Sequence, residues 1–243
     1  MPLPGHTRSS HQPDHLLQTP DTFVRAPLPG MTSASAIVHA APAIGARFTQ
    51  YTVELEAGGC FETTESQSFL YVIEGEIELR ADRRRLGPAE FLYVPPDNAR
   101  VVSAAAPSRI VVIEKPFVAL DASAPSLLFG SEREVSPSPL LDDEAIEVRN
   151  LIPDRMEFDF AVNTMTFAPG AQLPMVEIHV MEHGLLMLEG EGVYRLGERW
   201  YNVAAGDFIW MAPYCPQWFG ALGKVPAKYL IYKDWNRHPL AVI

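Results

Sequence analysis

The chain has 243 residues, of which 47% are hydrophobic and 20% are charged, the balance of an ordinary globular protein with room for one large domain or two medium-sized ones. Its formal net charge is −11 without a stripe of lysine and arginine, which argues against nucleic acid and anionic membranes as partners. No apolar stretch approaches the roughly 18 residues of a membrane span, the N-terminus has no apolar signal core, and two distant cysteines, Cys60 and Cys215, give no disulfide framework, so we expect a cytoplasmic protein.

Residues 1–30 form a segment with almost no periodicity. They contain six prolines and three histidines, His6, His11 and His15, together with several serines and threonines. Such a composition predicts an extended or disordered arm. We expect the three histidines to be solvated in this arm and not to bind metal.

The rest of the chain is dominated by short apolar or alternating runs that end at glycine, proline or aspartate. Examples are "RFTQYTVEL", "SFLYVIEGEIEL", "RIVVIEKPF", "HGLLMLEGEGVYRL", "DFIWMAPY" and "KYLIYKDW". Runs of this kind predict β-strands, and their number and spacing predict an all-β sandwich or barrel.

The runs repeat in the same order along the chain. "YVIEGEIEL" (71–79) aligns with "LMLEGEGVY" (186–194) at an offset of 115, and "VVIEK" (111–115) aligns with "YLIYK" (229–233) at an offset of 118. A repeat at nearly constant spacing indicates a duplicated β-domain. We expect an N-terminal barrel at 31–118, a Pro/Ser-rich and then acidic linker at 119–147, and a C-terminal barrel at 148–243.

The stretch "VEIHVMEHG" (176–184) carries the most specific chemistry. Val176, Ile178 and Val180 alternate with Glu177 and His179, which predicts a strand with Glu177 and His179 on one face. His183 lies near a bend before a glycine, from which it can reach the same cavity. From these residues alone, a metal site and two partly buried structural histidines are both open.

The neighbouring residues resemble the two motifs of the cupin superfamily. Gly170, Glu177, His179, His183 and Gly190 follow the order of the first motif, and Gly206, Pro213 and Gln217 follow the second. The resemblance implies a bicupin, two jelly-roll β-barrels in tandem. It departs from the common set of three histidines and one glutamate: glutamate replaces the first histidine, His183 the glutamate, and Gln217 the last histidine.

This exchanged set, Glu177, His179, His183 and Gln217, resembles that of the (S)-ureidoglycine aminohydrolase family. The resemblance covers residues 22–243 and is strongest over 158–238. It implies hydrolysis of (S)-ureidoglycine to (S)-ureidoglycolate and ammonia in purine (allantoin) catabolism, with one Mn²⁺ per chain in the C-terminal barrel. A site with two imidazoles, a carboxylate and an amide oxygen is also a donor set that suits Mn²⁺.

The first half serves as a comparison within the same chain. Across the repeat, the four ligands fall on Glu62, Thr64, Ser68 and Ala99, of which only the glutamate could bind a metal. We therefore expect the N-terminal barrel to be metal-free and to have a structural role.

Three further residues are candidates for holding the substrate. Tyr229 and Lys233 are four apart in one strand and so share a face, and Tyr194 ends another strand. The family resemblance implies that these three positions contact the substrate, with Lys233 facing its carboxylate. Glu177 and Lys233 are the two candidates for transferring the proton that the departing ammonia requires.

Two other functions stay open at this point. The fold also hosts dioxygenases, and a bicupin without turnover could bind a small organic acid. In each case the partner is a small molecule, and bicupins of this kind tend to form homo-oligomers.

Overall fold

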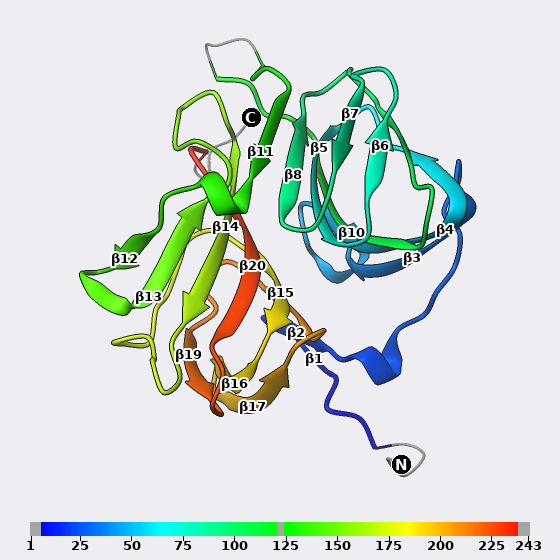
Figure 1. The fold of residues 1–243 in the computed structure, drawn as a ribbon. Helices are drawn as coiled ribbons and strands as arrows, with labels where there is room; N and C mark the ends of the chain where they lie inside the picture. Colours follow the sequence, from blue (N-terminus) through cyan, green and yellow to red (C-terminus); the bar gives the residue numbers. More distant parts are fainter. Residues whose placement is uncertain (1–5, 121–123, 238–243) are drawn as a thin grey trace. The chain divides into compact units, whose positions relative to one another are not determined.

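The computed structural model describes residues 6–120 and 124–237, and almost all of its regular structure is β-strand. The chain forms two compact units, each built on a curled antiparallel sheet with its own core (Figure 1). The prediction of an all-β protein with two barrels is thus confirmed. Within the described residues, no helix has the length and apolar character needed to cross a membrane.

The N-terminal barrel comprises Val24–Val135 and Arg155–Asp159. Its sheet has the order β11-β8-β5-β10-β4-β9-β6-β7, and β3 pairs with β4. The core holds alternate residues of these strands, including Val53, Leu70 and Ile110, because every second side chain of a strand points to the same face. The elements are β3 (Thr32–Ala40), η2 (Pro42–Ile44), β4 (Thr49–Glu62), β5 (Gln67–Glu74), β6 (Ile77–Leu79), β7 (Arg84–Leu86), β8 (Glu90–Val94), β9 (Val101–Ser103), β10 (Ser108–Lys115), β11 (Leu128–Ser131) and η3 (Glu132–Glu134).

The C-terminal barrel comprises Met1–Phe23, Ser136–Asp154 and Phe160–Ile243. An eight-stranded sheet of order β1-β2-β18-β15-β20-β14-β13-β12 is accompanied by a three-stranded sheet, β17-β16-β19. The elements are β1 (Ser10–Gln12), β2 (His15–Gln18), η1 (Pro20–Thr22), β12 (Ser138–Leu140), β13 (Asp143–Asn150), β14 (Phe160–Phe167), β15 (His183–Glu189), β16 (Glu191–Leu196), β17 (Arg199–Ala204), β18 (Phe208–Met211), β19 (Gln217–Leu222) and β20 (Ala227–Asp234).

Aromatic side chains pack against one another inside the C-terminal barrel. Phe219 lies edge-on to Phe167, with ring centroids 4.9 Å apart, and edge-on to Tyr229 at 5.7 Å. Large buried rings of this kind contribute much of the apolar burial in a small barrel and fix the neighbouring strands. Tyr229, one of the residues expected to hold the substrate, belongs to this group of rings.

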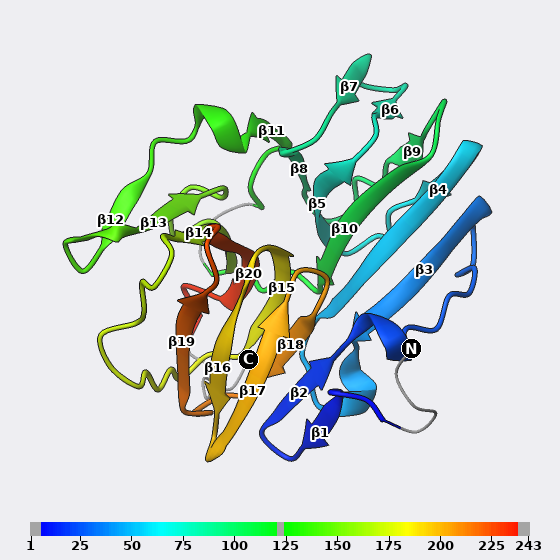
Figure 2. The ribbon, with the colours of Figure 1, turned by 60° about the horizontal axis from the view of Figure 1, so that its bottom comes forward.

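Residues 10–18 differ from the expected extended or disordered arm. They form the hairpin β1–β2, and β2 pairs with β18, with His15 opposite Met211 and Leu17 opposite Ile209 (Figure 2). Leu17 is fully buried. The partner strand lies almost two hundred residues away, so the short run His15–Gln18 carries no local signal of the strand it joins.

The segment expected as a linker, 119–147, also contributes strands. β11 completes the sheet of the N-terminal barrel by pairing with β8, whereas β12 and β13 extend the sheet of the C-terminal barrel. A later segment, Arg155–Asp159, returns to the N-terminal barrel. There the Asp159 carboxylate forms a buried ion pair with Lys115, with Nζ and Oδ2 2.6 Å apart.

Candidate active site

The segment that carries Glu177 and His179 is an irregular loop, so the strand predicted at 176–180 is wrong. The loop touches β19 at two isolated bridges, Gln172 with Gly220 and Glu177 with Gln217. Five residues of the loop therefore span the distance that three residues of β19 cover, and the chain bulges outward between the bridges. Pro174 lies within the bulge and has no N–H to donate to a ladder.

The two-residue alternation nevertheless survives in the loop. Ile178 is 61% exposed, whereas the side chains of Glu177 and His179 are 23% and 36% exposed and face inward together. Glu177 Oε2 lies 3.2 Å from His179 Nε2. The sequence pattern thus gave the correct orientation of these two residues for the wrong secondary structure.

Backbone bonds hold the loop against the residues on its other side. The Glu177 N–H donates to the Gln217 carbonyl at 2.8 Å, and the Gln217 N–H donates back to Glu177 at 2.9 Å. The Tyr214 N–H donates to the His179 carbonyl at 2.7 Å. These bonds hold segments 177–179 and 214–217, which are about forty residues apart in sequence, beside each other.

The remaining two predicted ligands complete the cluster. The rings of His179 and His183 lie 5.1 Å apart, and the Tyr194 hydroxyl donates to Gln217 Oε1 at 3.0 Å. His183 Nδ1 donates to the carbonyl of Glu182 at 2.7 Å, which leaves Nε2 unprotonated. The structure therefore places His179 beside both Glu177 and His183, and it links Gln217 to Glu177 through the backbone and to Tyr194 through the side chain.

The electrostatic environment keeps His183 neutral. The side chain is 2% exposed, and burial lowers its pKa well below the usual value, with the charges of Lys233 and His179 acting in the same direction. A neutral imidazole is the form that binds a metal. The partner at the neighbouring strand position is Lys233, which lies opposite His183 in the β15–β20 pair.

Lys233, Tyr194 and Tyr229 lie on the same interior side. Tyr229 is opposite Met187 in the β15–β20 pair, two rows below Lys233. Burial lowers the pKa of Lys233, and the charge of Glu177 partly opposes that shift. Burial and the charge of Glu177 both raise the pKa of Tyr194 and that of Tyr229, which keeps both phenols protonated as hydrogen-bond donors.

A small cavity of about 120 Å³ adjoins Lys233. Asn163, on β14, is 5% exposed and donates its amide to Asn150 on β13. The sequence prediction did not include Asn163. The usable signal was a polar residue among the interior-facing residues of "FAVNTMTF", where an apolar one is expected. The cavity is lined by Val148, Asn150, Ile152, Asp154, Ala161, Asn163, Lys233 and Trp235.

The same position in the N-terminal barrel is filled by its own polar network. Lys115 is opposite Gln67 in the β5–β10 pair, as Lys233 is opposite His183, so Gln67 rather than the expected Ser68 faces the lysine. Gln67 Nε2 donates to Asp159 Oδ1 at 2.6 Å, and Tyr93 donates to Gln67 Oε1 at 3.0 Å. That this barrel is metal-free stays a prediction.

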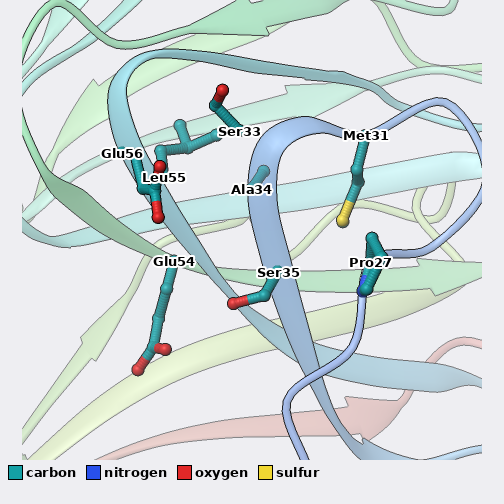
Figure 3. Close-up of a pocket in the computed structure, with 8 residues that line it drawn as sticks. All are labelled: Pro27, Met31, Ser33, Ala34, Ser35, Glu54, Leu55 and Glu56. Atoms are coloured by element: carbon teal, nitrogen blue, oxygen red, sulfur yellow. The ribbon is translucent and has the colours of Figure 1, made fainter.

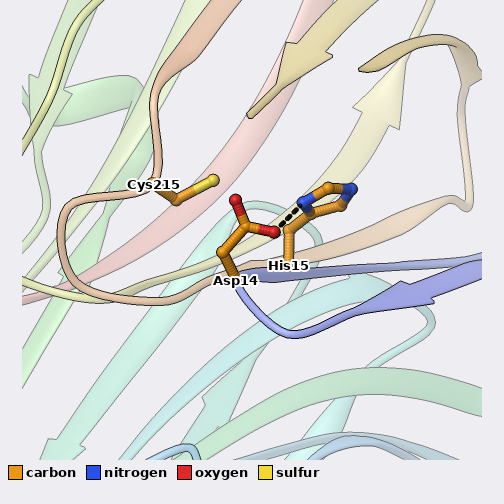
Figure 4. Close-up of side chains that lie close together, drawn as sticks. All are labelled: Asp14, His15 and Cys215. Atoms are coloured by element: carbon orange, nitrogen blue, oxygen red, sulfur yellow. Dashed lines mark hydrogen bonds and ion pairs between the residues drawn. The ribbon is translucent and has the colours of Figure 1, made fainter. Parts of the chain in front are cut away.

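Two further features lie outside the predicted cluster. In the N-terminal barrel, a surface hollow of about 430 Å³ is bordered by Glu54 and Glu56 (Figure 3). In the C-terminal barrel, Asp14, His15 and Cys215 gather at the β1–β2 turn, with their polar atoms within 4.8 Å of one another (Figure 4). His15, expected in a solvated arm, is only 2% exposed.

Cys215 is protonated at neutral pH. Burial raises the pKa of its thiol to about 12, and the negative charge of Asp14 adds to the shift. A thiol in this state is a poor nucleophile. Cys215 is therefore not a candidate nucleophile.

Comparison with known proteins supports the fold and identifies similar chains. Residues 163–232 match the family model described as "Cupin domain". The chain is 38% identical to (S)-ureidoglycine aminohydrolase of Arabidopsis thaliana, over 98% of this chain and 81% of that protein. It is 33% identical to (S)-ureidoglycine aminohydrolase of Escherichia coli, over 91% and 88% of the two chains.

Solved structures show the same fold. Protein Ylba from E. coli superimposes with a TM-score of 0.86 at 29% identity, over 97% of both chains. A putative glyoxylate-induced protein from Pseudomonas aeruginosa gives 0.89 at 30% identity, over 100% of this chain and 96% of that one. Oxalate decarboxylase of Bacillus subtilis, at 11% identity and a TM-score of 0.68, shares the fold alone. The predicted bicupin architecture is confirmed.

Proposed function

Because the chain belongs to the (S)-ureidoglycine aminohydrolase family, we propose that it hydrolyses (S)-ureidoglycine to (S)-ureidoglycolate and ammonia. The observation that carries the proposal is the position of His179, whose Nε2 lies 3.2 Å from Glu177 Oε2 and whose ring lies 5.1 Å from that of His183, in a loop bonded through the Glu177 backbone to Gln217. Lys233, on the strand beside His183, adds a cation for an acidic substrate. Such a site fits a small molecule with a carboxylate and a basic nitrogen.

The donor set supports a bound Mn²⁺. Glu177 offers a carboxylate and Gln217 an amide oxygen, while His183 has Nδ1 engaged with a carbonyl and Nε2 free to bind. This combination of two imidazoles with oxygen donors is suited to Mn²⁺. A bound Mn²⁺ would act as a Lewis acid on the substrate.

The protein's own groups account for substrate orientation. The Lys233 ammonium pairs with the substrate carboxylate, since a charged pair in a partly buried site is strong and directional. The Tyr194 phenol donates to Gln217 Oε1 and holds that amide in place, and the Tyr229 phenol, which donates to Met165 Sδ at 3.3 Å, would turn its proton to the substrate when it binds. Asn163, at the cavity beside Lys233, offers an amide that matches the ureido group in donors and acceptors.

The reaction replaces an amine by a hydroxyl, so water loses a proton and the departing ammonia gains one. Glu177 and Lys233 are the two groups in the site that can move this proton. The charge of Glu177 raises the pKa of Lys233 against the larger effect of burial, so the two groups interact across the site. We also propose a homo-oligomeric protein of the cytoplasm, without nucleic-acid partners, that acts in purine (allantoin) catabolism.

Product analysis tests this function against its alternatives. Purified protein given ureidoglycine should release ammonia and ureidoglycolate in equal amounts, with no oxygen consumed. Oxygen uptake with a diketone or flavonol and no ammonia release would support a dioxygenase instead. Metal and ligand binding without any turnover would support a binding protein.

A further inference from the structure

The β1–β2 hairpin lies against the loop that leads to Gln217. This loop, residues 212–216, joins β18 to β19, and the pairing of β2 with β18 brings the hairpin turn to its first residue (Figure 2). The Ala212 N–H donates to the Asp14 carbonyl at 2.9 Å. The hairpin is thus a direct neighbour of the candidate site's frame.

The Asp14 side chain lies beside Cys215 of the same loop. Its Oδ1 lies 2.8 Å from His15 Nδ1, and the Cys215 sulfur is within 4.8 Å of both residues' polar atoms (Figure 4). A Cβ at Gly197 would stand 2.8 Å from Asp14 Oδ2. Gly197 also has φ +58, so both its backbone and its lack of a side chain suit this close approach.

A chain of contacts holds Asp14 in place. His15 is buried between Asp14 and Tyr201, with Nε2 2.8 Å from the Tyr201 hydroxyl. That hydroxyl donates to Ser10 Oγ at 3.2 Å, which ties β17 to β1. Asp14 is therefore fixed by the barrel wall on one side and presented to loop 212–216 on the other.

Backbone hydrogen bonds connect this loop to the site residues. The Tyr214 N–H donates to the carbonyl of His179, and Gln217 exchanges two backbone bonds with Glu177. Tyr214 has φ +65, a conformation that costs a non-glycine residue about 1 kcal/mol or more and that its surroundings must hold. A loop with such a residue depends on contacts at both ends.

We propose that Asp14, supported by His15 and Tyr201, is a positioning residue that fixes loop 212–216 and through it the side chains of His179 and Gln217. The N-terminal hairpin is then part of the active site although it contributes no ligand. The inference rests on the proposed function only where it treats His179 and Gln217 as metal ligands. The contacts themselves are independent of any bound ion.

Hydrogen–deuterium exchange on metal-free protein tests the contacts directly. In Asp14→Ala, the amides of the four non-proline residues of 212–217 and that of Glu177 should exchange about tenfold faster, because the loop opens locally. Arg8→Ala is the matched control: it removes an ion pair of the same segment with Asp207, at 2.6 Å, without touching the loop. Unchanged exchange at 212–217 in Asp14→Ala, or an equal increase in Arg8→Ala, overturns the proposal.

Mn²⁺ affinity, measured by electron paramagnetic resonance without substrate, tests the consequence. Asp14→Ala should bind Mn²⁺ about tenfold more weakly, as when outer contacts of metal ligands are removed, while Asp14→Asn keeps an acceptor for His15 and should recover most of the affinity. If Asp14→Ala does not fold, Tyr201→Phe, which deletes one hydroxyl from the support, should give a smaller loss. Full affinity in Asp14→Ala or Tyr201→Phe contradicts the proposal.

The two readouts separate this inference from the proposed function. If wild-type protein binds no Mn²⁺ but loop exchange responds to Asp14→Ala, the metal assignment fails and the positioning role stands. A Cd²⁺ titration can also overturn the positioning role. A thiolate–Cd²⁺ absorption band that Cys215→Ser abolishes would show that Asp14, His15 and Cys215 form a metal site in their own right.

Discussion

Lys233 and Lys115 occupy equivalent places in the two barrels, and their replacement by methionine should have opposite effects. Lys115 is 6% exposed and its Nζ lies 2.6 Å from Asp159, which is fully buried. Within the described residues, Lys233 has no carboxylate at ion-pair distance. Lys115 is therefore paired within the fold, whereas we propose that Lys233 pairs with the substrate.

The structure sets the size of both effects. Among the described residues, Lys115→Met leaves the buried Asp159 carboxylate with hydrogen bonds from Gln67 and the Val118 N–H. Removing one partner of a buried ion pair lowers the free energy of unfolding by about 3 kcal/mol. For a chain of this length, that corresponds to a fall of about 6–12 °C in Tm. Lys233→Met removes a charge that burial disfavours, so Tm should stay constant or rise by a few degrees. Loss of a charged hydrogen bond to substrate should lower kcat/KM by about 30- to 150-fold, the equivalent of about 2–3 kcal/mol.

Thermal unfolding and ammonia release, measured on the same preparations, check the pair. Lys233→Met should be stable with the lowered kcat/KM given above, and Lys115→Met should be less stable but active at temperatures where it is folded. Near-normal turnover in Lys233→Met removes this lysine from the account. A fall in Tm equal to that of Lys115→Met shows that Lys233 is a structural residue like its counterpart.

Three other predictions concern single side chains. Tyr194→Phe removes the donor to Gln217 Oε1, so the free energy of unfolding should fall by about 1 kcal/mol. A Mn²⁺ titration should show about tenfold weaker binding, and unchanged affinity would show that Gln217 is not a metal ligand. Asn163→Leu should raise KM for ureidoglycine about tenfold with little change in kcat, because only the cavity beside Lys233 is altered; a loss confined to kcat would refute a binding role. Burial lowers the pKa of His39 from 6.5 to about 3. As the pH falls below about 6.5, the unfolded chain therefore binds this proton before the folded one does. The contribution of His39 to the free energy of unfolding is fully present above about pH 6.5 and declines toward pH 3 by up to about 1.4 kcal/mol per pH unit. Urea unfolding at pH 7 and pH 5 should show a smaller decline in His39→Gln than in the wild type, and equal declines would contradict the assignment.

The repeated pattern was enough to place the interior residues of the second barrel. Period-two alternation depends on backbone geometry alone, so Tyr229 and Lys233 could be assigned to one face without knowing their neighbours. The same alternation oriented Glu177 and His179 correctly, although the loop has too few pairing partners to be a strand. Their convergence with Gln217 came from the family resemblance rather than from spacing.

The long-range pairings were beyond what the sequence shows. His15–Gln18 forms a strand because it pairs with β18, and the buried Asp159 carboxylate pairs with Lys115, a residue of the same unit that lies 44 positions earlier in the chain. Such partners are chosen by tertiary contacts that a local pattern does not record. The role proposed for Asp14 was hidden for the same reason.

Ammonia release by metal-stripped protein, with and without added Mn²⁺, is the most direct test of the central claim. Ureidoglycine is generated in place from allantoate, and the wild type is compared with Glu177→Ala and with Glu62→Ala, the exposed counterpart in the N-terminal barrel. We predict turnover that requires Mn²⁺, is lost in Glu177→Ala and persists in Glu62→Ala. Equal turnover without metal, or full activity in Glu177→Ala, would contradict a catalytic metal site in the C-terminal barrel.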